Sequence, residues 1–104
     1  MIDCIREHLS QEELLCQLAE EASELAKAAL KLRRVYDGTN PTPTGRGEAF
    51  SNLLEEIADV NVAITVLGLD SAHNLMEISG IMDKKIERWY RRLEEAEAKK
   101  EPAE

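Results

Sequence analysis

Apolar residues recur at spacings of three and four along three long segments of this chain of 104 residues, and this pattern strongly constrains the fold. Side chains with such spacing lie on one face of an α-helix. In the first segment, Ser10 and Glu13 form a capping-box pair, and we expect a helix from Gln11 to Val35. Its apolar face consists of Leu14, Leu18, Leu25, Ala28 and Leu32.

Two further segments carry the same pattern. We expect a second helix from Glu48 to Leu67, ended by Gly68, and a third helix that is capped by Asp70 or Ser71. The apolar face of the second helix consists of Leu53, Ile57, Val60, Ile64 and Leu67. The apolar face of the third helix consists of Leu75, Ile78, Met82, Ile86, Trp89 and Leu93.

The composition favours an all-α fold. The apolar fraction is 43% and only four residues are aromatic, so Leu, Ile, Val and Ala must build the core. We predict one domain over residues 1–104, a helical bundle of three long helices with room for a short extra one. A single layer of helices in a chain of this length buries little surface, so we expect a homodimer or a homotetramer to complete the bundle.

The segment 36–47 interrupts the helical pattern. It holds three glycines and two prolines, which predicts a flexible loop that is either a functional lid or simply mobile. The last residues, 96–104, alternate charged and small side chains and include Pro102, so we expect this tail to fray. The ordered part of the chain is thus expected to span about residues 10–95.

Charge and cysteine usage restrict the partners and the compartment. A net charge of -8 disfavours binding to nucleic acid or to an anionic membrane, and no apolar run approaches the roughly 18 residues of a membrane span. Cys4 and Cys16 do not form a C-x-x-C motif, and we interpret them as reduced thiols, with Cys16 packed. We therefore expect a cytoplasmic protein.

Two acidic motifs fall within the apolar repeats. They are Glu21-x-x-Glu24 and Glu56-x-x-Asp59, and residues three apart share a helix face. A solvated helix face explains one such motif taken alone. However, the motif occurs on two helices, and neither copy has a Lys or Arg four residues later. Four converging carboxylates, without His or Cys ligands nearby, predict a Mg²⁺ site, with Mn²⁺ as a substitute ion.

The sequence resembles the MazG-like, all-α nucleoside triphosphate pyrophosphohydrolases. The resemblance extends over about residues 10–95 and is carried by LAEEASELAKA (Leu18 to Ala28), LLEEIADVNVAITVL (Leu53 to Leu67) and KKIERWYRRLEE (Lys84 to Glu95). It implies Mg²⁺-dependent hydrolysis of a nucleoside triphosphate to the monophosphate and pyrophosphate, which would remove unwanted nucleotides from the cellular pool. The metal ligands of the family fall on Glu21, Glu24, Glu56 and Asp59.

The resemblance extends to other side chains of the reaction. Glu20 and Glu55 match the leading acid of each pair, where they either hold a water near the metal or face solvent, and any of the six acids could accept the proton of the attacking water. Lys85 and Arg88 are the closest match to a phosphate-binding pair, although the family's arginine lies four residues after its lysine, at Trp89 here.

Two more residues complete the predicted substrate site. Arg92 shares a helix face with Lys85 and Arg88, and Asn61 either orients a water near the metal or caps a carbonyl. The three basic residues are alternatively surface charges paired with nearby glutamates. The alternative to the enzyme as a whole is a non-catalytic helical protein that keeps the bundle and binds or regulates a partner.

Overall fold

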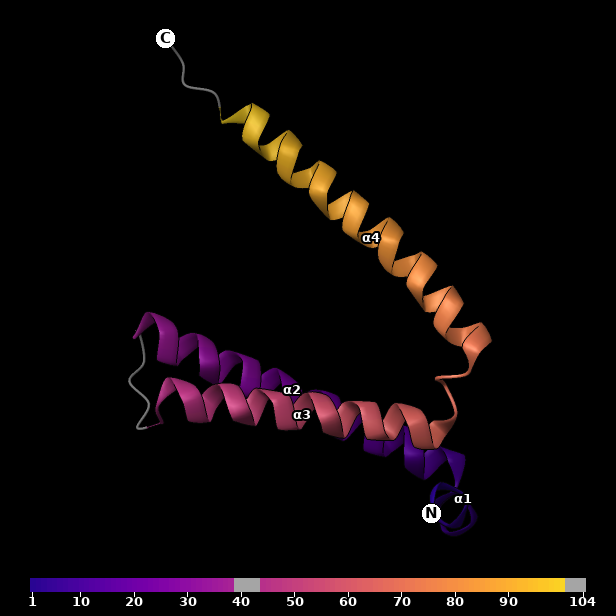
Figure 1. The fold of residues 1–104 in the computed structure, drawn as a ribbon. Helices are drawn as coiled ribbons and strands as arrows, with labels where there is room; N and C mark the ends of the chain where they lie inside the picture. Colours follow the sequence, from indigo (N-terminus) through magenta and orange to yellow (C-terminus); the bar gives the residue numbers. More distant parts are fainter. Residues whose placement is uncertain (39–43, 101–104) are drawn as a thin grey trace. The chain divides into compact units, whose positions relative to one another are not determined.

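The computed structural model describes residues 1–38 and 44–100, and over these residues the chain is entirely helical or irregular, without strands (Figure 1). The helices are α1 (Ile2–His8), α2 (Gln11–Asp37), α3 (Arg46–Leu67) and α4 (Ala72–Lys99). The predicted all-α class is confirmed, with three long helices and one short one.

Hydroxyl side chains begin two of the long helices. The Ser10 hydroxyl accepts a hydrogen bond of 3.1 Å from the backbone nitrogen of Glu13, and Ser71 accepts one of 3.2 Å from that of Asn74. These bonds satisfy amide groups that have no partner within the helix. The caps predicted at Ser10 and Ser71 are therefore confirmed.

Glycine ends both helices of the hairpin that α2 and α3 form. Gly38 follows α2 with φ of 67°, and Gly68 follows α3 with φ of 76°. This left-handed conformation is strained for residues with a Cβ atom. At Gly68 the bonds from Leu69 N to Ile64 O and from Gly68 N to Thr65 O form a Schellman motif, so the predicted stop at Gly68 is confirmed.

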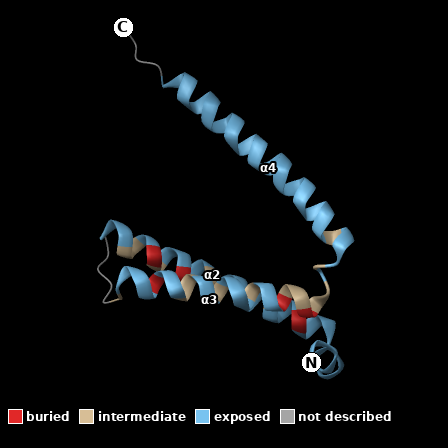
Figure 2. Ribbon diagram, viewed as in Figure 1, coloured by how far each residue is buried: buried red, intermediate tan, exposed pale blue. Residues whose placement is uncertain are grey.

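The core lies between α2 and α3, which run antiparallel to each other (Figures 1 and 2). Ala49 and Ala63 are buried on α3, and such small residues allow two helix backbones to approach closely. No large side chain is fully buried in the described part of the chain. The buried apolar residues are Leu14, Ala28, Leu32, Ala49, Ala63 and Val66.

The predicted core face is confirmed for α2 and holds only in part for α3. Leu14, Ala28 and Leu32 are buried as expected, but the face of α3 toward α2 contains Ala49, Ala63 and Val66. Within the predicted stripe, Ile57 is 39% exposed and the other four residues are half-buried. The buried residues Ala49 and Ala63 are small, so the size of apolar side chains alone does not reveal this face.

Both ends of the chain hold more helix than predicted. The segment before residue 10 forms α1, which contacts α3, and α4 continues to Lys99 instead of ending near Glu95. Tyr36 and Asp37 extend α2, and Arg46 and Gly47 begin α3, so the ends of the predicted loop are helical. Its centre, 39–43, and the tail residues 101–104 lie outside the described residues.

Cys16 is exposed and unpaired with Cys4, so its predicted packing is wrong.

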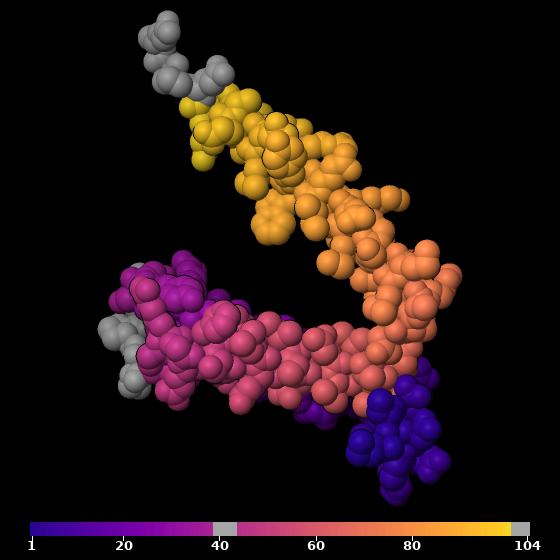
Figure 3. Space-filling model, in the orientation of Figure 1, coloured from indigo at the N-terminus to yellow at the C-terminus, as the bar shows by residue number. Residues whose placement is uncertain are grey.

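The chain divides into two compact units, Met1–Leu69 and Asp70–Glu104. The first unit is the α2–α3 hairpin with α1, and Figure 3 shows the side chains of α3 forming a continuous surface in front of α2. The second unit contains α4, in which no residue is buried. None of the described helices has an apolar stretch long enough to cross a lipid bilayer. The single domain and the homo-oligomer stay predictions.

Candidate metal centre

Three carboxylates meet at the middle of the α2–α3 hairpin. One oxygen from each of Glu21, Glu56 and Asp59 lies within 4.8 Å of the other two. Glu21 comes from α2, whereas Glu56 and Asp59 come from α3. The structure therefore brings together three of the four predicted metal ligands, and it does so across two helices.

Glu21 and Glu56 occupy positions at which a helix pair usually buries apolar side chains. Glu21 lies seven residues from Leu14 and from Ala28, both of which are buried. Glu56 lies seven residues from Ala49 and from Ala63, which are also buried. Because seven residues make about two helical turns, each glutamate points in the same direction as the buried residues on either side of it. The carboxylates are half-buried between the helices as a result.

This arrangement makes the charged form of Glu56 unfavourable. The pKa of its carboxyl group is raised above the ordinary value, first by desolvation and then by the negative charges of its neighbours. The neighbours that raise it are Asp59, Glu21, Glu24 and Glu55, in decreasing order of effect. A bound cation would offset both causes, because it replaces the lost hydration and neutralises the repulsion.

Glu24 and Glu21 have additional partners within α2. Lys27 approaches Glu24 Oε1 with its Nζ atom at 3.4 Å, and Glu24 is exposed. Lys27 is three residues after Glu24, so a spacing of four residues does not indicate this i,i+3 pair. The side chain of Gln17 donates a hydrogen bond of 2.7 Å from Nε2 to Glu21 Oε1. This bond holds one carboxylate oxygen of Glu21 on the α1 side of the group.

An apolar hollow adjoins the carboxylates on the side of α1. Its volume is about 290 Å³, and Glu21 and Asp59 form part of its wall. The rest of the wall is apolar except for Gln17. The other residues that line this hollow are Ile5, Leu9, Leu14, Gln17, Val62, Ala63 and Val66.

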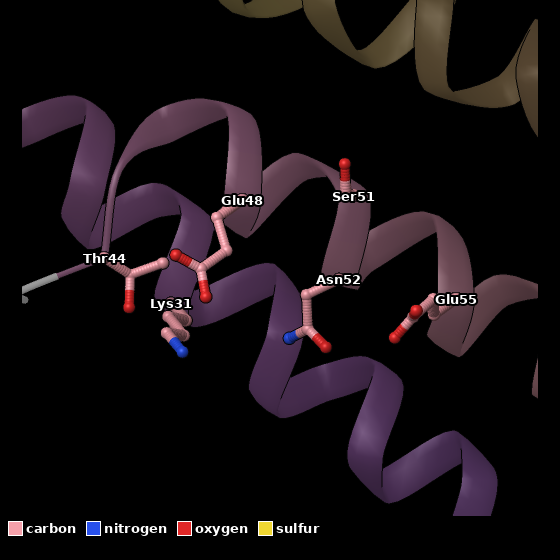
Figure 4. Close-up of a pocket in the computed structure, with 6 residues that line it drawn as sticks. All are labelled: Lys31, Thr44, Glu48, Ser51, Asn52 and Glu55. Carbon is pink, nitrogen blue, oxygen red and sulfur yellow. The ribbon is translucent and has the colours of Figure 1, made fainter.

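A polar hollow of about 300 Å³ lies toward the loop end of the hairpin (Figure 4). Lys31 of α2 and Glu48, Asn52 and Glu55 of α3 line it together with Thr44 and Ser51. In Figure 4 the side chains of Asn52 and Glu55 point toward α2, whereas the hydroxyl of Ser51 points away from it. Glu55 thus belongs to this polar hollow, one residue before the ligand candidate Glu56.

The remaining predicted site residues lie outside the carboxylate group. Glu20 is exposed, and Asn61 lines a separate apolar hollow formed by α1 and α3. Lys85, Arg88 and Arg92 are exposed on α4, where their spacing places them on one face. In the part of α4 that the structure describes, Arg91 pairs with Glu87 and His73 approaches Glu77, whereas these three residues form no ion pair. The alternative that pairs them with nearby glutamates is therefore not observed.

Sequence reasoning missed three polar residues beside the group, namely Gln17, Lys31 and Asn52. A repeat of seven would have indicated them, because Gln17, Glu24 and Lys31 are seven residues apart on α2, and Asn52 is seven residues before Asp59 on α3.

The comparisons with protein-family models, with curated proteins and with solved structures found no match to this chain.

Proposed function

We propose that this protein is a Mg²⁺-dependent nucleoside triphosphate pyrophosphohydrolase of the MazG-like type, acting in the sanitation of the cytoplasmic nucleotide pool. The observation that carries the proposal is the group of three carboxylate oxygens within 4.8 Å of one another, supplied by two helices, with Glu21 and Glu56 half-buried at core positions. Half-buried like charges destabilise a small hairpin, so a cation gives this arrangement a physical reason.

The donor set fits Mg²⁺. It consists of carboxylate oxygens from Glu21, Glu56 and Asp59, and hard oxygen ligands are those that Mg²⁺ prefers. Glu24, which lies on the same side of α2 and whose Oε1 is 3.4 Å from Lys27 Nζ, is the fourth ligand that we propose. Mn²⁺ prefers similar ligands and would substitute. When bound, the metal neutralises the triphosphate oxygens and lowers the pKa of a water molecule.

The chemical step would be attack of a water oxygen on the α-phosphorus. A new P–O bond forms to the water, the bond from the α-phosphorus to the bridging oxygen of the β-phosphate breaks, and the products are the monophosphate and pyrophosphate. A carboxylate takes the proton of the water. Both leading acids are exposed, and Glu55 is the better candidate for this role because it also lines the polar hollow.

The proposal also includes an assembly of identical chains. The apolar side of α4 is uncovered, with Trp89 68% exposed, and α3 exposes Phe50, Leu54 and Ile57. Burial of such surface in a homodimer or homotetramer would supply the core that the described hairpin lacks. In that assembly we assign Lys85, Arg88 and Arg92 to contacts with the leaving pyrophosphate, and Asn61 to a supporting role near the substrate.

The uncovered face of α4 also favours a second candidate function. A helix of 28 residues with no buried residue and a continuous apolar stripe is suited to binding another protein. The chain would then be a non-catalytic interaction or regulatory protein. This alternative does not explain why glutamates occupy core positions of α2 and α3.

The test is pyrophosphate release from a panel of canonical and damaged nucleoside triphosphates with Mg²⁺ or Mn²⁺. We expect activity in the wild type and a loss of at least about 100-fold in Glu56→Gln, because this change removes a charged metal ligand. Glu12→Gln, an exposed acid on the same hairpin, serves as the control and should keep full activity. Equal rates in wild type and Glu56→Gln, or no pyrophosphate from any substrate, would remove the enzyme proposal.

A further inference from the structure

The α2–α3 hairpin carries three levels of side chains along one side. On α2 these are Gln17, Glu24 and Lys31, and on α3 they are Val66, Asp59 and Asn52, all in steps of seven. Because the helices are antiparallel, Gln17 and Val66 share the α1 end, where both line the apolar hollow. Lys31 and Asn52 share the loop end, where both line the polar hollow. The acids lie between these two ends.

The α1 end is suited to a flat apolar group. Exposed apolar side chains line its hollow, among them Val62, which is 59% exposed, and Ile5, which is 41% exposed. Gln17 supplies one amide at the wall, and its Nε2 atom is already directed at Glu21. The volume of this hollow, about 290 Å³, is just below the range of about 300–1,000 Å³ that small-ligand pockets occupy.

The loop end is suited to phosphate. Lys31 and Asn52 are both half-buried and line the hollow. Among the described residues, neither side chain makes an ion pair or hydrogen bond, in contrast to Lys27 and Arg33, which pair with Glu24 and Asp37. An ammonium and an amide that face the same hollow can both donate to phosphate oxygens.

The same hollow contains two carboxylates, Glu48 and Glu55. They would repel a bare polyphosphate, since Lys31 offsets only one of their charges. A polyphosphate already neutralised by Mg²⁺ avoids this repulsion. We therefore expect the loop end to accept the metal complex and to exclude free pyrophosphate.

From these two ends we infer the orientation of the substrate: the nucleobase lies in the apolar hollow beside α1, and the terminal phosphates extend past the carboxylates to Lys31 and Asn52. This inference rests on the proposed function, and it adds contacts from the hairpin to the terminal phosphates beside those proposed for Lys85, Arg88 and Arg92 of α4. Glu24 and Lys31 are about 10 Å apart along the axis of α2. The side chain of Lys31 is long, so its ammonium group can lie closer to the carboxylates than its backbone does.

The experiment is titration calorimetry in the presence of Mg²⁺. Two kinds of probe are titrated into the protein, namely inorganic pyrophosphate and a set of nucleoside monophosphates. We expect Lys31→Ala to weaken pyrophosphate binding by about tenfold or more, since a charge-assisted bond is lost, and to leave monophosphate binding within about twofold. Lys31→Arg should keep most of the pyrophosphate affinity. Arg33→Ala removes a positive charge from the opposite side of the same turn and should change neither affinity.

The α1 end is tested with Val62→Gln, which puts a polar side chain into the apolar hollow at an exposed position. We expect weaker binding of the monophosphates, by about fivefold or more, and unchanged binding of pyrophosphate and of ribose 5-phosphate, which has no base. If Lys31→Ala weakened the binding of monophosphates and Val62→Gln weakened the binding of pyrophosphate, the substrate would have the opposite orientation and the inference would be overturned. Equal effects of Lys31→Ala and Arg33→Ala would overturn it as well.

Failure of this inference can be separated from failure of the proposed function. Turnover of triphosphates by the wild type, together with unchanged pyrophosphate binding in Lys31→Ala, would reject the orientation and keep the enzyme. Binding of Mg²⁺ and pyrophosphate without turnover of any triphosphate would reject the enzyme and keep the phosphate site. Absence of pyrophosphate binding in the wild type with Mg²⁺ rejects the orientation.

Discussion

The guanidinium group of Arg6 on α1 donates a hydrogen bond of 2.7 Å from Nε to the backbone oxygen of Val66 near the end of α3. Its Nη2 atom donates a second bond of 3.0 Å to the oxygen of Thr65. Carbonyl groups in the last turn of a helix carry partial negative charge, which the guanidinium group of Arg6 offsets, and Thr65 O accepts from Gly68 N as well. Arg6 thereby attaches α1 beside the apolar hollow of the candidate site.

Replacement of Arg6 tests this attachment. We expect Arg6→Ala to lower the free energy of unfolding by about 1–2 kcal/mol, because two charge-assisted bonds are lost at a partly exposed site. Urea denaturation measures the change. Arg33→Ala, which removes an exposed i,i+4 ion pair with Asp37, should cost less than about 0.5 kcal/mol. Equal stability of wild type and Arg6→Ala would show that α1 is held by other contacts.

Divalent metal should stabilise the folded chain. At a Mg²⁺ concentration of about 100 times the Kd, binding to the folded state alone adds about 2.7 kcal/mol. For a domain of this size we expect the Tm to rise by about 10 °C or more. Thermal denaturation with Mg²⁺ and with a chelator measures the shift. Ca²⁺ at equal ionic strength serves as the control for specificity, and a shift that persists in Glu56→Gln would place the metal elsewhere.

The raised pKa of Glu56 predicts a definite dependence of stability on pH. The folded state holds this proton at pH values at which the unfolded chain has already lost it, so the stability that the group contributes falls as the pH rises from 4.5 through the raised value. Without metal, Glu56→Gln should therefore match the wild type below pH 4.5 and have a higher Tm at neutral pH. A difference in Tm that does not change with pH would contradict this linkage.

Apolar replacement should separate stability from metal binding. Glu21 lies between buried Leu14 and Ala28, so Glu21→Leu would continue the apolar face of α2. In the absence of metal we expect a higher Tm than in the wild type, because a half-buried charge is replaced by a side chain that gains from burial. The variant should lose the Mg²⁺-dependent rise in Tm. A lower Tm without metal would mean that the Gln17 bond to Glu21 stabilises the hairpin more than apolar contact does.

The last helix offers a separate prediction. If Lys85 and Arg88 contact phosphate in an assembly of chains, the double variant Lys85→Ala/Arg88→Ala should raise the KM for a triphosphate by about tenfold or more. Replacement of Arg91, which pairs with Glu87 on the same helix, should leave the KM unchanged. Steady-state kinetics at a protein concentration that maintains the assembly is the measurement. An unchanged KM would restrict the phosphate contacts to the hairpin.

The sequence alone determined which segments form helices and where most of these helices begin and end, because both depend on interactions between residues that are close in the chain. The cap at Ser10 and the stop at Gly68 arise from contacts within a few residues, and the apolar repeat of α2 reports its buried side directly. It also indicated that Glu21 and Glu56 interrupt apolar faces.

Only the tertiary structure decided how these faces meet. The short helix α1 depends on Arg6 and its bonds to residues about 60 positions away, which no local pattern contains. The side of α3 that packs on α2 includes the small buried residues Ala49 and Ala63, so it is not the side that the largest apolar residues alone indicate. That choice turns Glu56 and Asp59 toward Glu21 and creates the candidate metal centre. Packing between distant segments depends on shape as well as on polarity, and polarity is the part that a sequence pattern records.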